Sequence, residues 1–207
     1  MIEIRQFLLM LQTAEVTVWK NRTDQIRVMK GLFFVHLYGA LEFAVSQSVR
    51  ESIEHLNAQN LMFKDLRPEL LSLGLNAQCD SLRDVGGSKK WEKRFELFKH
   101  VNASLPVSFD DSVVPTSGRN VDGIELDSVW NAFGLTSTST PSPSARQRLT
   151  TLVRNRNAIA HGDEAPSEVG GRYSVNELGV YLSDLDLTVT HVVLSLDKYL
   201  ADGQFRI

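Results

Sequence analysis

Residues 154–162 read RNRNAIAHG, so two arginines, two asparagines and a histidine lie within one short stretch. Directly upstream, Leu149, Leu152 and Val153 form an apolar stripe at helical spacing. Gly162, at the end of the stretch, is the residue type that most often follows the last residue of a helix. The sequence therefore predicts a helix whose last turns carry these polar side chains.

The polar side chains of this stretch suit a phosphodiester ligand. At about 100° per residue, Asn157 and His161 share a face, as do Arg154 and His161, whereas Arg156 is offset from His161 by about 140°. A planar guanidinium can hold two phosphate oxygens at once, and an imidazole can transfer a proton near neutral pH. Together these groups could cleave RNA without a metal ion.

The string RNAIAHG resembles the hallmark of the HEPN superfamily of α-helical ribonucleases and toxins, which is an arginine, usually an asparagine, and a histidine a few residues later. In this chain those positions are Arg156, Asn157 and His161. The resemblance implies that Arg156 and His161 are catalytic, and that Asn157 and Arg154 support them or contact RNA. The residues by themselves also allow solvated arginines and a histidine that the helix dipole favours as a cation.

An acidic residue on an earlier segment is a further candidate. Tyr38 and Glu42 lie one helical turn apart in the apolar region 26–45, where a carboxylate needs a partner or a cavity. Some HEPN groups carry an acidic or polar residue on an early helix that points at the motif, so the resemblance implies that Glu42 orients Arg156 or His161. A helix carboxylate paired with a cation elsewhere is the alternative.

Apolar residues repeat at threes and fours along most of the chain, which predicts helices. The predicted segments are about 4–19, with a cap at Asn21 or Thr23, then 24–55, 68–74, 89–101, 124–133, a motif helix that begins at Pro143 or Ser144, and a last helix that runs to about Ala201 behind the capping box of Ser174 and Glu177. The second segment is apolar nearly all round and should be the most buried, and the last is long enough to pair antiparallel with it.

Three shorter features complete the expected layout. Trp91, Phe95 and Phe98 share one helical face, which is more typical of a core than of a base-stacking platform. Residues 102–121 are expected to be irregular, with a short strand pair, and residues 136–144, TSTSTPSPS, to be mobile. The expected fold is all-α, a bundle of four to five main antiparallel helices with short additional helices and an irregular insertion, similar to the HEPN fold.

Length and composition restrict the class of protein. The 207 residues, 43% hydrophobic and 23% charged, predict one soluble globular domain over residues 1–207. The net charge of −3 argues against a protein that coats nucleic acid, so RNA must bind locally, as at the basic group Arg146, Arg148, Arg154 and Arg156. A single cysteine and the absence of a signal peptide or an apolar membrane span predict a cytoplasmic protein that does not enter membranes.

The sequence carries no nucleotide-binding, redox or zinc motif, so no cofactor and no metal site are predicted. The resemblance implies a metal-independent endoribonuclease, acting on RNA as a homodimer with a composite cleft, in the role of a toxin or antiphage effector that a protein antitoxin or other regulator restrains. The tyrosine that some HEPN toxins carry two residues after the histidine is Asp163 here, which puts inactivation by nucleotidylation in doubt. A non-catalytic HEPN module that binds RNA, a nucleotide or a partner protein, and a plain helical interaction protein, are the alternatives.

Overall fold

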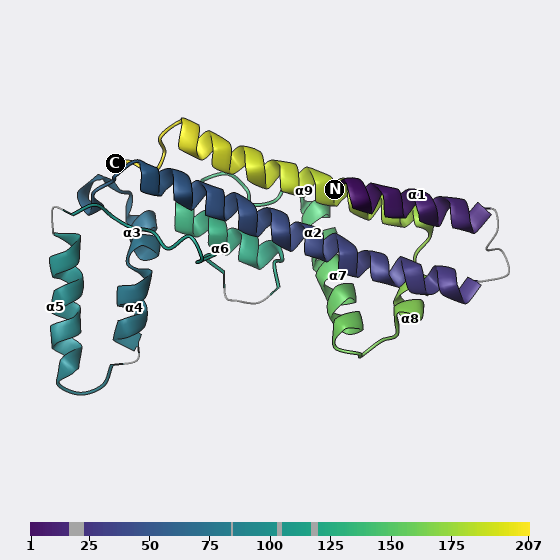
Figure 1. The fold of residues 1–207 in the computed structure, drawn as a ribbon, viewed down its shortest axis with the longest axis horizontal. Helices are drawn as coiled ribbons and strands as arrows, with labels where there is room; N and C mark the ends of the chain where they lie inside the picture. The colour runs from purple at the N-terminus through teal and green to yellow at the C-terminus, as the bar shows by residue number, and fades with distance from the viewer. Residues whose placement is uncertain (17–22, 84, 103–104, 117–119) are drawn as a thin grey trace. The chain divides into compact units, whose positions relative to one another are not determined.

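The computed structural model describes residues 1–16, 23–83, 85–102, 105–116 and 120–207, and these are helical except for connecting loops (Figure 1). No named strand occurs among them; two isolated bridges join Met62 to Pro106 and Leu66 to Arg206. The helices are α1 (Ile2–Val16), α2 (Thr23–Ala58), α3 (Pro68–Gly74), α4 (Asn76–Arg83), α5 (Lys89–Val101), α6 (Gly123–Phe133), α7 (Pro143–Ala160), α8 (Pro166–Gly171) and α9 (Val175–Ala201), with a 3-10 turn, η1 (Phe63–Asp65). The all-α prediction is confirmed.

Most predicted helix ends are confirmed, because local signals set them. Pro68 opens α3, Gly134 follows α6 with a φ of +68°, and α9 starts after the predicted capping box. In that box the Ser174 N–H donates to Glu177 Oε2 at 2.7 Å, and the Glu177 N–H donates to Ser174 Oγ at 3.2 Å. The described part of α1 ends at Val16, and the predicted extension to Trp19 and cap at Asn21 lie outside the described residues.

Two compact units share helices α2, α6 and α9. The first consists of residues 1–45, 118–126 and 138–192, and the second of residues 46–117, 127–137 and 193–207. The RNAIAHG string lies wholly in the first unit, whereas α3, α4 and α5 lie in the second. The single domain expected from chain length stays a prediction.

In the first unit α1 runs antiparallel to α2. Near the start of α1, the Phe7 ring lies edge-on to Phe33, with 5.6 Å between ring centroids. Near its end, Glu15 Oε1 lies 3.7 Å from Nζ of Lys30, which precedes Phe33 by about one turn of α2. The buried side of α2 supplies much of this core through Phe33, Phe34, Leu37 and Leu41.

The same helix α1 is antiparallel to α9, since Arg5 pairs with Asp186 while Leu8 lies beside Gly179. Two helices that both run antiparallel to α1 run parallel to each other. The predicted antiparallel pairing of α2 with α9 is therefore wrong. A short hairpin enforces antiparallel neighbours, whereas here the chain passes through all the other elements before α9 begins.

Helix α8 crosses α2 with almost no space between the two backbones. A Cβ atom on Gly31 would lie 2.0 Å from the carbonyl oxygen of Pro166, and one on Gly170 would lie 1.9 Å from that of Arg27. Only glycine permits this approach. Beside the crossing, Lys30 Nζ donates to the carbonyl oxygen of Tyr173 at 2.6 Å, so that the loop following the motif helix is held against α2.

Helix α2 also meets the length and composition criterion for a membrane span, with a mean hydropathy of 1.4 over its most apolar window. Within that window 44% of the residues are buried inside the fold. A core helix meets the same criterion, because both environments select apolar side chains.

Residues 136–144 were expected to be mobile, and this expectation is wrong for the part that belongs to the first unit. Ser139 and Thr140 are buried, the Thr138 hydroxyl donates to the Thr140 carbonyl at 3.0 Å, and a ring nitrogen of His191 lies 2.7 Å from the Thr138 carbonyl oxygen. Low complexity signals few apolar contacts, but the Thr138 hydroxyl here finds a partner within the segment and the Thr138 carbonyl finds one on α9.

In the second unit Tyr199 is fully buried between Phe133 and Phe205, with ring centroids at 5.7 and 6.2 Å. The irregular segment around Phe109 is fastened to α2 by two hydrogen bonds with the amide side chain of Asn57, of 2.8 and 2.9 Å. The predicted strand pair is absent from the described part of residues 102–121, where Pro106 forms one isolated bridge.

Helix α5 has the predicted bounds but not the predicted environment. Trp91, Phe95 and Phe98 are 73%, 69% and 63% exposed, so their prediction as core residues is wrong. Helices α4 and α5 pack against each other as a pair on either side of the Gly86–Gly87 turn (Figure 1), and the polar side of α5 faces α4.

Candidate functional site

Helix α7 ends where the sequence predicted. Its N-cap, Ser142, accepts a hydrogen bond from the Ala145 N–H at 3.1 Å, and Pro143 occupies the first turn. At the other end His161 is the C-cap, and Gly162 adopts a φ of +76°, the left-handed conformation that glycine favours. The motif side chains therefore emerge from the last turns of α7.

Three uncharged groups hold the Arg156 guanidinium. Its NH1 group donates to Oδ1 of Asn120 at 2.7 Å and to Oδ1 of Asn157 at 2.9 Å, and its central carbon lies 4.3 Å from the centre of the Tyr38 ring. Among the described residues, no ion pair involves Arg156. The positive charge is thus positioned but not neutralised, as a binding site for an anion requires.

Tyr38 is itself fixed from two sides. Its side chain is 1% exposed, its hydroxyl accepts a hydrogen bond from the Val121 N–H at 3.0 Å, and it lies 3.4 Å from Oε1 of Glu42, to which it donates. Burial raises the pKa of the Tyr38 phenol, although the hydrogen bond from Val121 acts in the opposite direction. The neighbouring residues Asn120 and Val121 thus bind Arg156 and the tyrosine beneath it.

Glu42 is exposed, and its described contact is the one with the Tyr38 hydroxyl. Its connection to Arg156 in the structure runs through the Tyr38 ring. The expectation that Glu42 orients Arg156 or His161 stays a prediction, and the structure indicates Tyr38 as the group through which it would act.

The two asparagines of RNRN have different surroundings. Asn157 is half-buried and accepts the hydrogen bond from Arg156. Asn155 is 2% exposed, and its Nδ2 donates to the Tyr173 hydroxyl at 2.9 Å, which joins α7 to the segment before α9. Asn155 therefore supports the packing of the motif helix.

His161 and Arg154 are exposed, as expected for side chains that meet a ligand. Within the described part of the chain, the structure records no hydrogen bond that orients the His161 ring. The arrangement joins Arg156 to Asn157 directly and leaves His161 on the open end of the helix, consistent with the offset of about 140° expected from helical geometry.

The predicted basic group is smaller in the structure than in the sequence. Arg148 forms an ion pair with Asp184, and Arg146 NH1 donates to Ser139 Oγ at 3.4 Å. These two arginines have internal partners, so the cations near the end of α7 are Arg154 and Arg156. Among the described residues no group of three or more His, Cys, Asp or Glu side chains could hold a metal ion.

Sequence reasoning missed Asn120, because it lies in an irregular segment without periodicity and far from α7 in the chain. Tyr38 could have been found, since its spacing of one turn from Glu42 already linked the two residues. The stacking of the Arg156 guanidinium on the Tyr38 ring, by contrast, follows only from the folded arrangement.

One comparison with known proteins identifies a family. No curated protein and no solved structure matches the chain significantly. A family model described as RiboL-PSP-HEPN matches residues 2–184, which run from the start of α1 into α9 and include the whole RNAIAHG string. The resemblance to the HEPN superfamily is confirmed: this chain is a HEPN module and belongs to the RiboL-PSP-HEPN family.

Proposed function

We propose that the protein is a metal-independent endoribonuclease that cleaves RNA through the 2′-hydroxyl. The observation that carries the proposal is the Arg156 guanidinium, which Tyr38, Asn120 and Asn157 hold and which no carboxylate of the described residues neutralises, on a helix that ends in the exposed His161. A phosphate bound by Arg156 would bring an RNA strand to the imidazole.

The reaction requires two proton transfers. The 2′-oxygen forms a bond to phosphorus while the bond from phosphorus to the 5′-oxygen breaks, leaving a 2′,3′-cyclic phosphate and a 5′-hydroxyl. The 2′-hydroxyl gives its proton to a neutral imidazole, and the departing 5′-oxygen takes one from an imidazolium. Arg156 stabilises the charge that develops on the phosphate oxygens.

One protomer offers a single His161, so a homodimer whose motif helices face each other would supply both protonation states. The angular offset of Arg156 from His161 favours the same arrangement, because Arg156 of one copy can bind the phosphate on which His161 of the other copy acts. Light scattering at micromolar concentration tests the assembly, and a strict monomer that still cleaves RNA would contradict it.

A non-catalytic role is the second candidate. It is favoured by the lack, within the described residues, of a hydrogen bond that orients His161, because general bases are usually held by one. In that role the module binds RNA, a nucleotide or a partner protein through Arg156 and Arg154.

As a ribonuclease the protein would act as a toxin or defence effector in the cytoplasm, with a protein antitoxin or regulator.

Incubation of the purified protein with total RNA in EDTA separates the two candidates. A ribonuclease yields fragments that end in 2′,3′-cyclic phosphate and leaves DNA of the same sequence intact. His161→Ala abolishes the fragments if the histidine is catalytic. Cleavage that EDTA abolishes, or efficient cutting of DNA, would count against the mechanism.

A further inference from the structure

Helix α5 turns its largest apolar side chains away from the fold. Trp91, Phe95 and Phe98 follow one another at spacings of four and three residues, which places them in one stripe on the helix. Each of the three side chains is more than 60% exposed. An exposed stripe of three aromatic residues indicates a surface that binds something.

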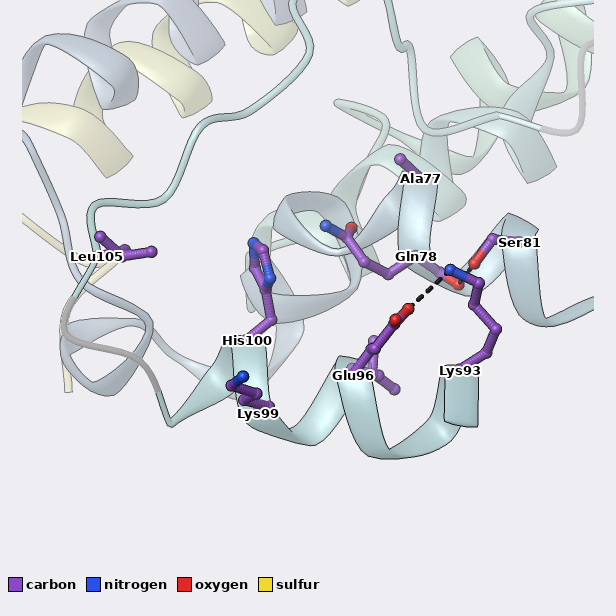
Figure 2. A pocket seen from close by; sticks show the side chains of 9 residues that line it. Ala77, Gln78, Ser81, Lys93, Glu96, Lys99, His100 and Leu105 are labelled. Atoms are coloured by element: carbon purple, nitrogen blue, oxygen red, sulfur yellow. Dashed lines mark hydrogen bonds and ion pairs between the residues drawn. The ribbon is translucent and has the colours of Figure 1, made fainter. Parts of the chain in front are cut away.

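The opposite side of α5 contains polar residues, although it faces the rest of the second unit. The α5 residues that line a pocket of about 460 Å³ between α5 and α4 are Lys93, Glu96, Leu97, Lys99 and His100. Figure 2 shows these side chains on the side of α5 toward Gln78 and Ser81 of α4, with the ion pair between Lys93 and Glu96 at 2.7 Å. Internal packing thus uses the polar face, and the aromatic face remains for an external ligand.

Helix α5 carries an excess of positive charge. Residues 89–100 contain five lysine or arginine residues and two glutamates, in a chain whose net charge is −3. At about 100° per residue, Lys90 and Arg94 flank the stripe on one side. Lys99, which also borders the pocket, flanks it on the other side together with Glu92. The Arg94 guanidinium carbon lies 5.0 Å from the centre of the Trp91 ring, so cation and aromatic ring already adjoin.

This charge argues against a second copy of the chain as the occupant. A two-fold contact of α5 with α5 through the stripe would place the flanking cations Lys90, Arg94 and Lys99 close to their own copies, and such juxtaposed like charges are costly. A polyanion complements the surface instead. Single-stranded nucleic acid offers phosphates for the cations and flat bases for the rings.

We propose that the exposed face of α5 binds single-stranded RNA, with bases stacked on Trp91, Phe95 and Phe98 and phosphates paired with Lys90, Arg94 and Lys99. The rings succeed one another by about 6 and about 4.5 Å along the helix axis. Both steps exceed the rise of about 3.4 Å between stacked bases, so each ring can take its own base. The identity of the ligand rests on the proposed function, but the binding needs no cleavage.

The test measures binding of a fluorescein-labelled 2′-O-methyl oligouridine, which lacks the reactive 2′-hydroxyl, to the full chain by fluorescence anisotropy. Trp91→Ala/Phe95→Ala/Phe98→Ala should weaken binding by about tenfold or more, since each stacked base contributes appreciably. Trp91→Phe combined with Phe95→Trp should retain affinity, because either ring stacks. Lys90→Ala/Arg94→Ala/Lys99→Ala removes three phosphate contacts. The slope of log K against log salt concentration should therefore become shallower by about 2.

The matched control is Leu9→Ala/Leu194→Ala, which removes two apolar side chains that are each 61% exposed on other helices. The control should bind RNA as the wild type does. Equal affinity of the aromatic triple variant and the wild type would overturn the proposal. So would equally strong competition by polyglutamate, which carries negative charge without bases and represents an acidic protein partner.

Self-association is a separate outcome. If light scattering shows that the triple alanine variant dissociates while its RNA affinity is unchanged, α5 joins copies of the chain and the proposal is wrong. A cleavage assay on ordinary RNA separates this inference from the proposed function. If binding depends on the three aromatic side chains but no RNA is cleaved, the ribonuclease proposal is wrong and the RNA-binding surface on α5 stands. If RNA is cleaved but binding does not depend on these side chains, the ribonuclease proposal stands and the RNA-binding surface is wrong.

Discussion

Removal of one hydroxyl, by Tyr38→Phe, should separate the two roles of Tyr38. The substitution leaves the Val121 N–H, in a residue that is 5% exposed, without its acceptor at 3.0 Å. An orphaned buried donor costs about 1–3 kcal/mol. For a chain of this length each kcal/mol lowers the melting temperature by roughly 2–4 °C, so the variant should melt about 2–12 °C below the wild type.

The phenyl ring of the Tyr38→Phe variant would still lie beneath the Arg156 guanidinium, so cleavage and RNA binding below the melting transition should be nearly unchanged. Tyr38→Leu removes the ring as well and gives up a cation–π contact of about 0.5–2 kcal/mol, which should weaken RNA binding by up to about 30-fold. Thermal unfolding followed by circular dichroism measures the change in melting temperature, and fluorescence anisotropy measures the change in RNA affinity. A Tyr38→Phe protein with wild-type stability would refute the reasoning, as would one that binds RNA no better than Tyr38→Leu.

His161→Ala should lower the cleavage rate by about 10²-fold or more with little change in RNA affinity, whereas Arg156→Ala should lower both and Arg156→Lys should restore them poorly. Gel assays measure the cleavage rate and anisotropy measures the affinity. A loss of several kcal/mol of stability in His161→Ala would identify a structural histidine. Gly170→Ala should destabilise the protein by about 2 kcal/mol or more in urea unfolding, because its Cβ would lie 1.9 Å from a backbone oxygen. The control Gly39→Ala, which has open space around it, should be neutral or stabilising by up to about 1 kcal/mol. Burial raises the pKa of Tyr181 to about 12 from an unfolded value of 10.0, so the free energy of unfolding should fall as the pH rises above 10. In Tyr181→Phe, urea titrations across this pH range should show a smaller decrease.

Helix bounds were predictable wherever a local signal ended the periodic pattern. Proline at the start of α3, the capping box before α9 and glycine after α6 and α7 each act within a few residues of the position they determine. The motif was predictable for the same reason, since Arg156, Asn157 and His161 lie within two turns of one helix.

The rest depended on contacts between distant residues. Periodicity shows that α5 has an aromatic face, but it does not show whether a neighbour covers that face, and in the structure the opposite face lies toward α4. The support of Arg156 by Asn120 links positions 36 residues apart through a segment with no pattern. The direction of α9 relative to α2 likewise follows from the path of the whole chain.

The glycine crossing of α8 and α2 bears on which length changes the chain can tolerate. Only residues 162–165 join the C-cap histidine of α7 to Pro166, whose carbonyl lies against Gly31. Gly162 turns the chain, and the Glu164 N–H donates to the Ala158 carbonyl at 3.1 Å. The path and the length of this connection are therefore both fixed. An inserted residue would have to displace either the end of the motif or the crossing, whereas insertions in the irregular residues 110–116 meet no such constraint.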